Sequence, residues 1–323
     1  MKLSTLVKPA FLAAAIACQQ ASAAVFFAAH PDDVALLMSR NAQTDIRAGY
    51  PTVIVLLTAG DAGNGVLPNA NTGAHQYNAN GNPYYRVRLN AHERAVGYLI
   101  NPNNIPAATR STENFGGSIP AVEKAVIGNV TTYYLNLPDG KMETFHSGGY
   151  ASLNDVTNTN SYTPATLREV LRQIIARNNR SKPTVVINLP EYNLDFYESG
   201  YNDILPGEGI RPTQKHGDHP DHVATGKFVM AAVNENPSYS CLFKAVFMGY
   251  GISSLPDGMS AADKQIQTSA FYALNNVLIS QGNWTYDYAL QKEQLGSADG
   301  FHMSFFGKVL WRDNGGGSHT CTF

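Results

Sequence analysis

Short apolar runs alternate with amphipathic stretches along the first two thirds of the chain. Thr52–Thr58 is an almost continuous apolar run, as expected of a strand that is buried on both faces. In Pro164–Asn179, apolar residues recur at helical spacing instead. These patterns predict four strands, at residues 25–29, 52–58, 131–137 and 184–189, and four helices, at residues 33–48, 84–100, 164–179 and 220–234.

Strands that alternate with helices predict a mostly parallel sheet, and therefore a doubly wound, Rossmann-like α/β fold with helices on both faces. The pattern changes beyond Pro237, where we expect a strand at 242–248, a helix at 261–280 and a last strand at 301–311. No linker separates this region from the rest of the chain. We therefore predict one domain over residues 24–323, in which residues 236–323 form a C-terminal α/β extension.

The N-terminus has the pattern of a signal peptide. Two lysines precede an apolar stretch at residues 10–17, and Ala21-Ser22-Ala23 supplies the small residues that a signal peptidase requires. We expect residues 1–23 to be removed, by cleavage after Ala23 or Ala24, and the protein to be secreted or periplasmic. A lipoprotein anchored through Cys18 is the alternative. No other apolar stretch is long enough to span a membrane.

Composition and charge narrow the range of partners. The chain has 44% hydrophobic and 15% charged residues, which is typical of a globular protein with a large core. Its formal net charge of -2, with acidic and basic residues mixed, gives no basic stripe for a phosphate backbone, so we expect no nucleic-acid partner. Beyond the signal peptide only Cys241 and Cys321 remain. In an oxidising compartment we expect a disulfide between them, and two unpaired buried thiols are the alternative.

A first group of potential metal ligands follows the first strand. His30-Pro31-Asp32-Asp33 stands at the end of the apolar run. A turn from strand to helix points successive side chains in different directions, so His30 and Asp33 can share a metal while Asp32 faces the water that the metal binds. The alternative is that Asp32 or Asp33 only caps the following helix.

A second group is denser, because His216, Asp218, His219, Asp221 and His222 crowd together at the start of a helix that a proline opens. The positive end of the helix dipole favours a neutral imidazole at His222, which is the form that binds metal. A carboxylate beside His219, from Asp218 or Asp221, is expected to orient it and to raise its proton affinity. A solvated, capped loop is the alternative, and it is the better interpretation for His216.

Further polar residues follow the other strands. Asp61 follows the second strand and Asp139 the third, and the carboxyl ends of the strands in an open α/β sheet form its ligand crevice. We therefore expect all these groups on one edge of the sheet. The predicted substrate contacts are Asp61, Arg88, Asp139, Lys141 and Tyr192. Tyr192 belongs to an aromatic loop, residues 191–211, which either binds substrate or covers the edge of the sheet.

The pairing of Ala29-His30-Pro31-Asp32-Asp33 with His219-Pro220-Asp221-His222 resembles the LmbE-like (PIG-L) family of zinc-dependent N-deacetylases, which act on N-acetylglucosamine-type substrates. Thr58–Asp61 and Leu137–Gly140 are similar to strand-end signatures of that family, and the resemblance covers about residues 25–235. It implies one Zn²⁺ per chain. The implied ligands are His30, Asp33 and His222. The resemblance further implies that Asp32 is the general base, and that His219, oriented by Asp221, polarises the amide carbonyl or protonates the departing amine.

The chain departs from the family pattern in three places. Val34 replaces the acidic residue that commonly follows the paired aspartates, the Arg-rich helix at residues 86–94 matches loosely, and the loop at residues 191–211 is long. These departures bear on the substrate more than on the chemistry.

The residues also indicate a mechanism by themselves. Two histidines and one aspartate leave metal positions open for water and a substrate oxygen, and bound zinc lowers the pKa of water from 15.7 to about 7 in favourable sites. Asp32 is then expected to accept a proton as hydroxide attacks an acetamide carbonyl, which releases acetate and a free amine.

Two other classes of protein fit parts of the pattern. His30-x-Asp32 with a distant histidine is also the facial triad of non-haem iron oxygenases, although those ligands usually lie on antiparallel β-barrels. A secreted carbohydrate-binding protein whose metal site has lost catalysis is the second alternative, and retention of both Asp32 and His219 argues against it.

Overall fold

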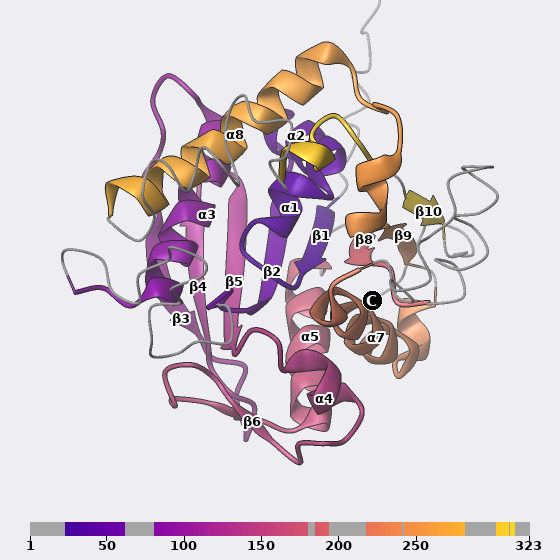
Figure 1. Ribbon diagram of the computed structural model, residues 1–323. Helices are drawn as coiled ribbons and strands as arrows, with labels where there is room; N and C mark the ends of the chain where they lie inside the picture. The colour runs from indigo at the N-terminus through magenta and orange to yellow at the C-terminus, as the bar shows by residue number, and fades with distance from the viewer. Residues whose placement is uncertain are drawn as a thin grey trace, which may run out of the picture.

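The computed structural model describes residues 23–61, 81–179, 185–193, 218–240, 242–281, 302–309 and 311–313. Its central strands are β1 (Ala23–Ala28), β2 (Thr52–Thr58), β5 (Val130–Leu137), β8 (Val185–Pro190) and β9 (Phe243–Phe247). Its edge strands are β3 (Thr109–Glu113), β4 (Val122–Ile127) and β10 (Trp311–Asp313). Together they form one eight-stranded sheet in the order β10-β9-β8-β1-β2-β5-β4-β3 (Figure 1).

The central strands all run parallel to one another, and antiparallel pairing occurs only toward the two edges of this sheet. Strand β1 shows why its sequence is apolar throughout. Val25 pairs with Val53 of β2 on one side and with Ile187 of β8 on the other. Phe26 and Phe27 are fully buried in cores on opposite faces of the sheet. A strand that is covered on both faces carries apolar residues at successive positions.

One face of the sheet is covered by α1 (Asp33–Leu36), α2 (Ser39–Arg47), α3 (Tyr84–Ile100) and α8 (Ala261–Ser280). The other face is covered by α4 (Met142–His146), α5 (Pro164–Asn179) and α7 (Pro220–Asn234). Figure 1 shows these two helical layers, with α8 lying along α3. A mostly parallel sheet between two layers of helices confirms the predicted doubly wound α/β fold.

Short elements complete the described structure. β6 (Leu153–Asn154) and β7 (Ser161–Tyr162) pair with each other apart from the main sheet. Three single turns of 3₁₀ helix are η1 (Pro237–Tyr239), η2 (Tyr250–Ser254) and η3 (His302–Phe305). In the C-terminal part of the chain, β9 and β10 extend the main sheet and α8 packs against α3.

The predicted continuous helix at residues 33–48 is wrong, because it is divided into α1 and α2. Leu36, Leu37 and Met38 are consecutive and all buried. Consecutive residues point about 100° apart around an α-helix, so one straight helix lying on a sheet does not bury three in a row equally. The break at Leu37 and Met38 lets all three side chains reach the core.

The predicted strand at residues 301–311 is also wrong. Its described part contains η3, and the strand β10 begins only at Trp311. Gly307 has φ +82°, in the left-handed region, which a strand does not adopt. The antiparallel strands β3 and β4 were not predicted, because β3 has no apolar residue to mark it.

Several predictions fall outside the described residues. These are the signal peptide up to residue 22, the pairing of Cys241 with Cys321, the position of His216 and most of the loop at residues 191–211. β1 begins at Ala23, where cleavage was predicted. Within the described parts of the chain, no helix is both long and apolar enough to cross a membrane.

Candidate metal centre

Polar side chains from three separate parts of the chain meet beyond the carboxyl end of β1. His30 and Asp33 lie between β1 and the first turn of α1, Asp139 follows β5, and His219 and His222 lie at the start of α7. All five groups take part in contacts with one another. The predicted convergence of the two histidine motifs on one edge of the sheet is therefore present.

Three buried groups form a compact triangle of ligand atoms. His30 Nδ1 lies 3.1 Å from His222 Nε2 and 3.5 Å from Asp33 Oδ1, and His222 Nε2 lies 3.1 Å from Asp33 Oδ1. Zinc binds nitrogen and oxygen ligands at about 2.0–2.2 Å, which at tetrahedral angles places the ligand atoms roughly 3.3–3.6 Å apart. The triangle therefore fits one divalent metal ion with little movement of the side chains.

The far nitrogen of each histidine in the triangle contacts a carboxylate. His222 Nδ1 lies 2.6 Å from Asp218 Oδ1, and His30 Nε2 lies 3.2 Å from Asp139 Oδ1 and 3.7 Å from Asp221 Oδ2. Histidine ligands of metals commonly donate their other N–H to a carboxylate, which fixes the tautomer and the ring orientation. This pattern leaves His30 Nδ1 and His222 Nε2 as the two nitrogens that can bind metal.

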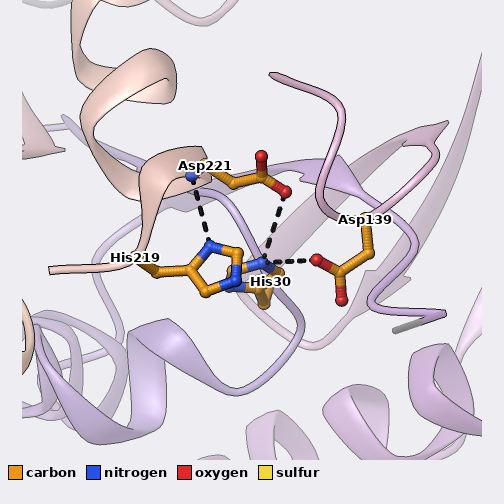
Figure 2. Close-up of side chains that lie close together, drawn as sticks. All are labelled: His30, Asp139, His219 and Asp221. Carbon is orange, nitrogen blue, oxygen red and sulfur yellow. Dashed lines mark hydrogen bonds and ion pairs between the residues drawn. The ribbon is translucent and has the colours of Figure 1, made fainter. Parts of the chain in front are cut away.

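A second group of possible ligands shares His30, and Figure 2 shows it: His30, Asp139, His219 and Asp221. Here Asp221 already accepts hydrogen bonds at both oxygens, Oδ2 from Gly140 N at 2.6 Å and Oδ1 from Met142 N at 3.0 Å. These bonds anchor the carboxylate to the start of α4. We therefore infer that this second group holds His30 in place, and that the triangle is the candidate metal site.

The contact between Asp221 and His219 differs from the prediction. The backbone N–H of Asp221, and not its carboxylate, donates to His219 Nδ1 at 3.2 Å (Figure 2). Because Nδ1 accepts this bond, the proton of a neutral His219 lies on Nε2, which is then a hydrogen-bond donor. The Asp221 carboxylate, which was predicted to orient His219, instead faces His30 and the residues at the start of α4.

Asp32 has surroundings unlike those of its neighbour Asp33. Its Oδ1 accepts a hydrogen bond from Arg88 Nη2 at 2.9 Å, and both side chains are buried. Asp32 occupies the N-cap position of α1 but makes no capping hydrogen bond, so the capping alternative is wrong for this residue. His92, one turn after Arg88 on α3, donates to the Pro31 carbonyl oxygen at 2.8 Å and so holds the same corner.

Among the described residues, two from the C-terminal part of the chain reach the site, and neither lies in a sequence motif that points to it. His302 Nε2, from η3, lies 4.0 Å from Asp32 Oδ2. Tyr250, at the start of η2, packs its ring 5.0 Å from that of His222, and its backbone N–H donates to Asp218 Oδ1 at 3.1 Å. The preceding residue is Gly249, at which any Cβ would collide with the Asp218 carboxylate.

Opposing electrostatic effects act within the triangle. Burial raises the pKa of Asp33, but the imidazoles of His222 and His30 outweigh burial and hold that pKa well below its usual range. Burial lowers the pKa of His222, whereas the carboxylates of Asp33 and Asp218 outweigh it and raise that pKa to about 10. In the absence of a metal these two carboxylates favour the protonated imidazole, which is opposite to the effect expected of the helix dipole. Carboxylates that stabilise protons here equally favour a divalent cation in their place.

The other titratable groups divide into ionised and neutral. Burial raises the pKa of Asp32, but Arg88 and then His302 outweigh burial and lower it, so Asp32 is ionised at neutral pH. Burial, together with the imidazoles of His30 and His222, lowers the pKa of His219. The Asp221 carboxylate acts in the predicted direction and raises that pKa, but it does not outweigh the other effects. Burial also lowers the pKa of His302, to about 4. Near pH 7 the site therefore contains an ionised carboxylate at Asp32 and neutral imidazoles at His219 and His302.

The predicted substrate contacts have other surroundings in this structure. Arg88 binds Asp32, as described above, and Asp61 Oδ1 accepts a hydrogen bond from Asp139 N at 2.8 Å. Lys141 is exposed at the start of α4. Tyr192 packs against α7, where a Cβ at Gly226 would lie 2.9 Å from the Tyr192 Cβ. Asp139 is the predicted contact whose side chain lies against a triangle residue, with its Oδ1 3.2 Å from His30 Nε2.

Comparison with known proteins finds likeness at the level of structure. No protein-family model matches the chain, and no curated protein matches it. The A40926 pseudoaglycone deacetylase Dbv21 is 13% identical with a TM-score of 0.42, over 90% of this chain and 96% of that one. The N,N'-diacetylchitobiose deacetylase of Pyrococcus horikoshii is 14% identical with a TM-score of 0.42, over 84% of this chain and 74% of that one.

The same degree of likeness extends to a different reaction. GalB, the 4-carboxy-2-hydroxymuconate hydratase of Pseudomonas putida, is 11% identical with a TM-score of 0.40, over 91% of this chain and 96% of that one. Likenesses this distant do not decide between activities, so the function must be argued from the residues of this chain.

Proposed function

We propose that the protein is a secreted, zinc-dependent hydrolase that removes the acetyl group from an N-acetylated amino sugar. The observation that carries this proposal is the triangle of His30, Asp33 and His222, in which each histidine is backed by a carboxylate. Asp32 precedes the triangle residue Asp33 in the chain and is an ionised carboxylate. The His219 ring contacts that of His30 and is a neutral N–H donor.

A zinc ion held by the triangle would supply Lewis acidity, which lowers the pKa of water and polarises an amide carbonyl. The protein residues supply the proton transfers. Arg88 occupies Oδ1 of Asp32, so Oδ2 is the oxygen that takes a proton from the attacking water. As the new carbon–oxygen bond forms, the Nε2–H of His219 donates a hydrogen bond to the developing oxyanion. Asp32 then returns its proton to the amine nitrogen as the carbon–nitrogen bond breaks.

The lowered pKa of His219 bears on a choice that the sequence left open. A histidine that stays neutral near pH 7 is a weak proton source but a good hydrogen-bond donor. Its fixed Nδ1, bound to the backbone of Asp221, also keeps the donor at Nε2. We therefore assign to His219 the polarisation of the carbonyl oxygen, and to Asp32 both proton transfers.

The iron-oxygenase alternative required His30 and Asp32 to share a metal with a distant histidine. Asp33 Oδ1, however, lies 3.1 Å from His222 Nε2, whereas Asp32 accepts a hydrogen bond from Arg88. These contacts favour Asp33 over Asp32 as the ligand. A set of two histidines and one carboxylate is nevertheless common to both classes. Metal analysis combined with a test for oxygen consumption distinguishes them, because the hydrolase needs no oxygen.

The decisive experiment is acetate release by the purified mature protein from N-acetylated sugars, chitin fragments, peptidoglycan pieces and glycolipids. We expect release from at least one of these classes, dependent on added Zn²⁺ and abolished in His222→Ala. Sugar binding without acetate release from any substrate would instead support the carbohydrate-binding alternative.

Export with removal of about 23 residues, measured by mass spectrometry of the secreted protein, tests the localisation.

A further inference from the structure

A second polar cavity lies on the same edge of the sheet as the metal centre. It has a volume of about 380 Å³, within the range of small-ligand sites. Its walls come from the start of α3, from β3, β4 and β5, and from the turn at residues 155–160. We call it the side pocket, and the lining residues used below are Arg86, Arg110, Thr112, Glu123, Asn136 and Thr159.

The charged side chains that line the side pocket all have partners within the protein: carboxylates pair with its two arginines, and backbone N–H groups of residues 157, 159 and 160 donate to the Asp155 carboxylate. Arg86 binds Glu123 through two hydrogen bonds, of 2.6 and 3.2 Å. Arg110 donates to Glu93 at 2.9 Å and to Asn90 at 2.6 Å, and also lies 3.5 Å from Glu123. Arginines that are fully paired with carboxylates offer little to a phosphate or sulfate. The pocket therefore suits an uncharged ligand.

The remaining lining is rich in groups that exchange hydrogen bonds. Thr112, on β3, and Thr159, on the turn at residues 155–160, both line the pocket and carry hydroxyl groups. Asn136 donates from Nδ2 to Glu123, while its buried Oδ1 has no partner among the described residues. An acceptor without a partner is best satisfied by a ligand hydroxyl or amide N–H. Many hydroxyls and no net charge are the chemistry of a sugar ring.

A bulge in β5 links the side pocket to the metal centre. The pairing of β2 with β5 shifts register after Leu56, and Asn136 has φ +55° at this point. Its carbonyl oxygen turns away from the ladder to accept the N–H of Val156 at 2.8 Å. Asn136 and Asp139 are three residues apart, so their α-carbons lie no more than about 11 Å apart. Asp139 contacts His30, so a ligand of a few linked rings can reach both places.

We propose that the side pocket binds a neighbouring sugar ring of an oligosaccharide whose N-acetyl group lies at the metal centre. This inference rests on the proposed deacetylase function and makes it more specific. The substrate is then a glycan of two or more linked neutral rings, and a free N-acetylated monosaccharide fills only part of the combined site.

The test compares N-acetylglucosamine with its β-linked tetramer. We expect kcat/KM for the tetramer to exceed that for the monomer by about tenfold, the gain of a few net hydrogen bonds. Thr112→Trp fills the pocket from an exposed position on β3, and Thr159→Trp fills it from an exposed position on the turn at residues 155–160, so one variant serves if the other does not fold. The matched control is Thr109→Trp, which is exposed on the same strand and does not line the pocket.

Both pocket variants should bring the ratio of the two kcat/KM values close to one, while Thr109→Trp keeps the wild-type ratio. Calorimetric binding of the tetramer to Asp32→Asn protein, with and without Thr112→Trp, should show about a tenfold loss of affinity. Acetate release with equal rates for monomer and tetramer, or a ratio that survives both pocket variants, would overturn the inference and leave the deacetylase standing. If no acetate is released, the proposed function fails, and the binding measurement still decides about the pocket.

Discussion

Asp32 and Asp33 are adjacent and chemically identical, and their roles differ only through the side chains around them. Asp33 lies between two imidazoles, and Asp32 faces an arginine. Both carboxylates have lowered pKa values, but a charged guanidinium cannot give way to a metal, whereas protons on the imidazoles can. The surroundings thus favour Asp33 as the metal ligand and Asp32 as the proton acceptor of the proposed mechanism.

We predict that Asp32→Asn retains the metal and loses nearly all turnover. The amide keeps the size of the side chain and accepts the hydrogen bond from Arg88, but it cannot take a proton from water, and general-base catalysis contributes about 10²–10⁴-fold. Acetate release and bound zinc, measured on the same preparation, check this. Undiminished turnover at full metal content would remove Asp32 from the mechanism.

Arg88 gives the reaction a predicted pH dependence. The pKa of Asp32 is lowered by Arg88 against the effect of burial, so the base stays ionised as the pH falls well below neutral. In Arg88→Gln the burial effect is no longer opposed by that charge, the pKa of Asp32 rises, and the acid limb of kcat/KM should move to higher pH. Arg94→Gln, exposed on the same helix, should leave the limb in place. An unchanged acid limb in Arg88→Gln would show that another group is the base.

The candidate metal ligands can be found from the sequence because they lie in two compact motifs. The sequence did not identify His302 or Tyr250, which come from segments with no local pattern of their own. Asp218 was recognised only as a possible partner of His219, although it lies four residues before His222 and contacts that ring instead. The choice between two histidines depends on how α7 is rotated against the sheet, and sequence spacing does not determine that rotation.

At the scale of elements, strongly periodic segments were predicted well. β2, α3, α7 and α8 begin and end where the pattern indicates. Two failures, the break between α1 and α2 and the missed strand β3, have a common cause. In both segments burial is set by neighbouring elements and not by a local pattern of apolar residues. β3 is a strand because β4 offers it a hydrogen-bonding edge, and nothing in its own residues requires this.

The position of α7, which carries both His219 and His222, depends on its close approach to β8. At Gly226 any Cβ would collide with the carbonyl oxygen of Pro190, so no larger residue fits without moving the helix. We expect Gly226→Ala to lower the free energy of unfolding by about 1–3 kcal/mol and to weaken zinc binding. Urea unfolding and zinc titration check this, with Lys227→Ala as the neighbouring control. Wild-type values in Gly226→Ala would show that this contact does not position the site.

At the scale of the whole molecule, the metal centre joins residues that are almost two hundred positions apart in the chain. His30 follows the central strand, His222 begins a helix on one face, and His302 comes from the layer that contains α8 on the other face. The unfolded chain does not hold His30, Asp33 and His222 together, so a metal that binds these three groups binds only the folded state. Metal affinity is therefore a contribution to the stability of the entire fold.

This coupling predicts a large effect of metal removal. A ligand at about 1,000 times its Kd stabilises the folded state by about 4 kcal/mol, which for a domain of this size corresponds to roughly 8–16 °C in Tm. Chelation of the wild-type protein should lower Tm by that amount, and added Zn²⁺ should restore it. His222→Ala should show no response to either treatment, because its remaining ligands cannot close the site. Equal Tm values for wild-type protein with and without zinc would mean that the triangle holds no metal, whatever its geometry.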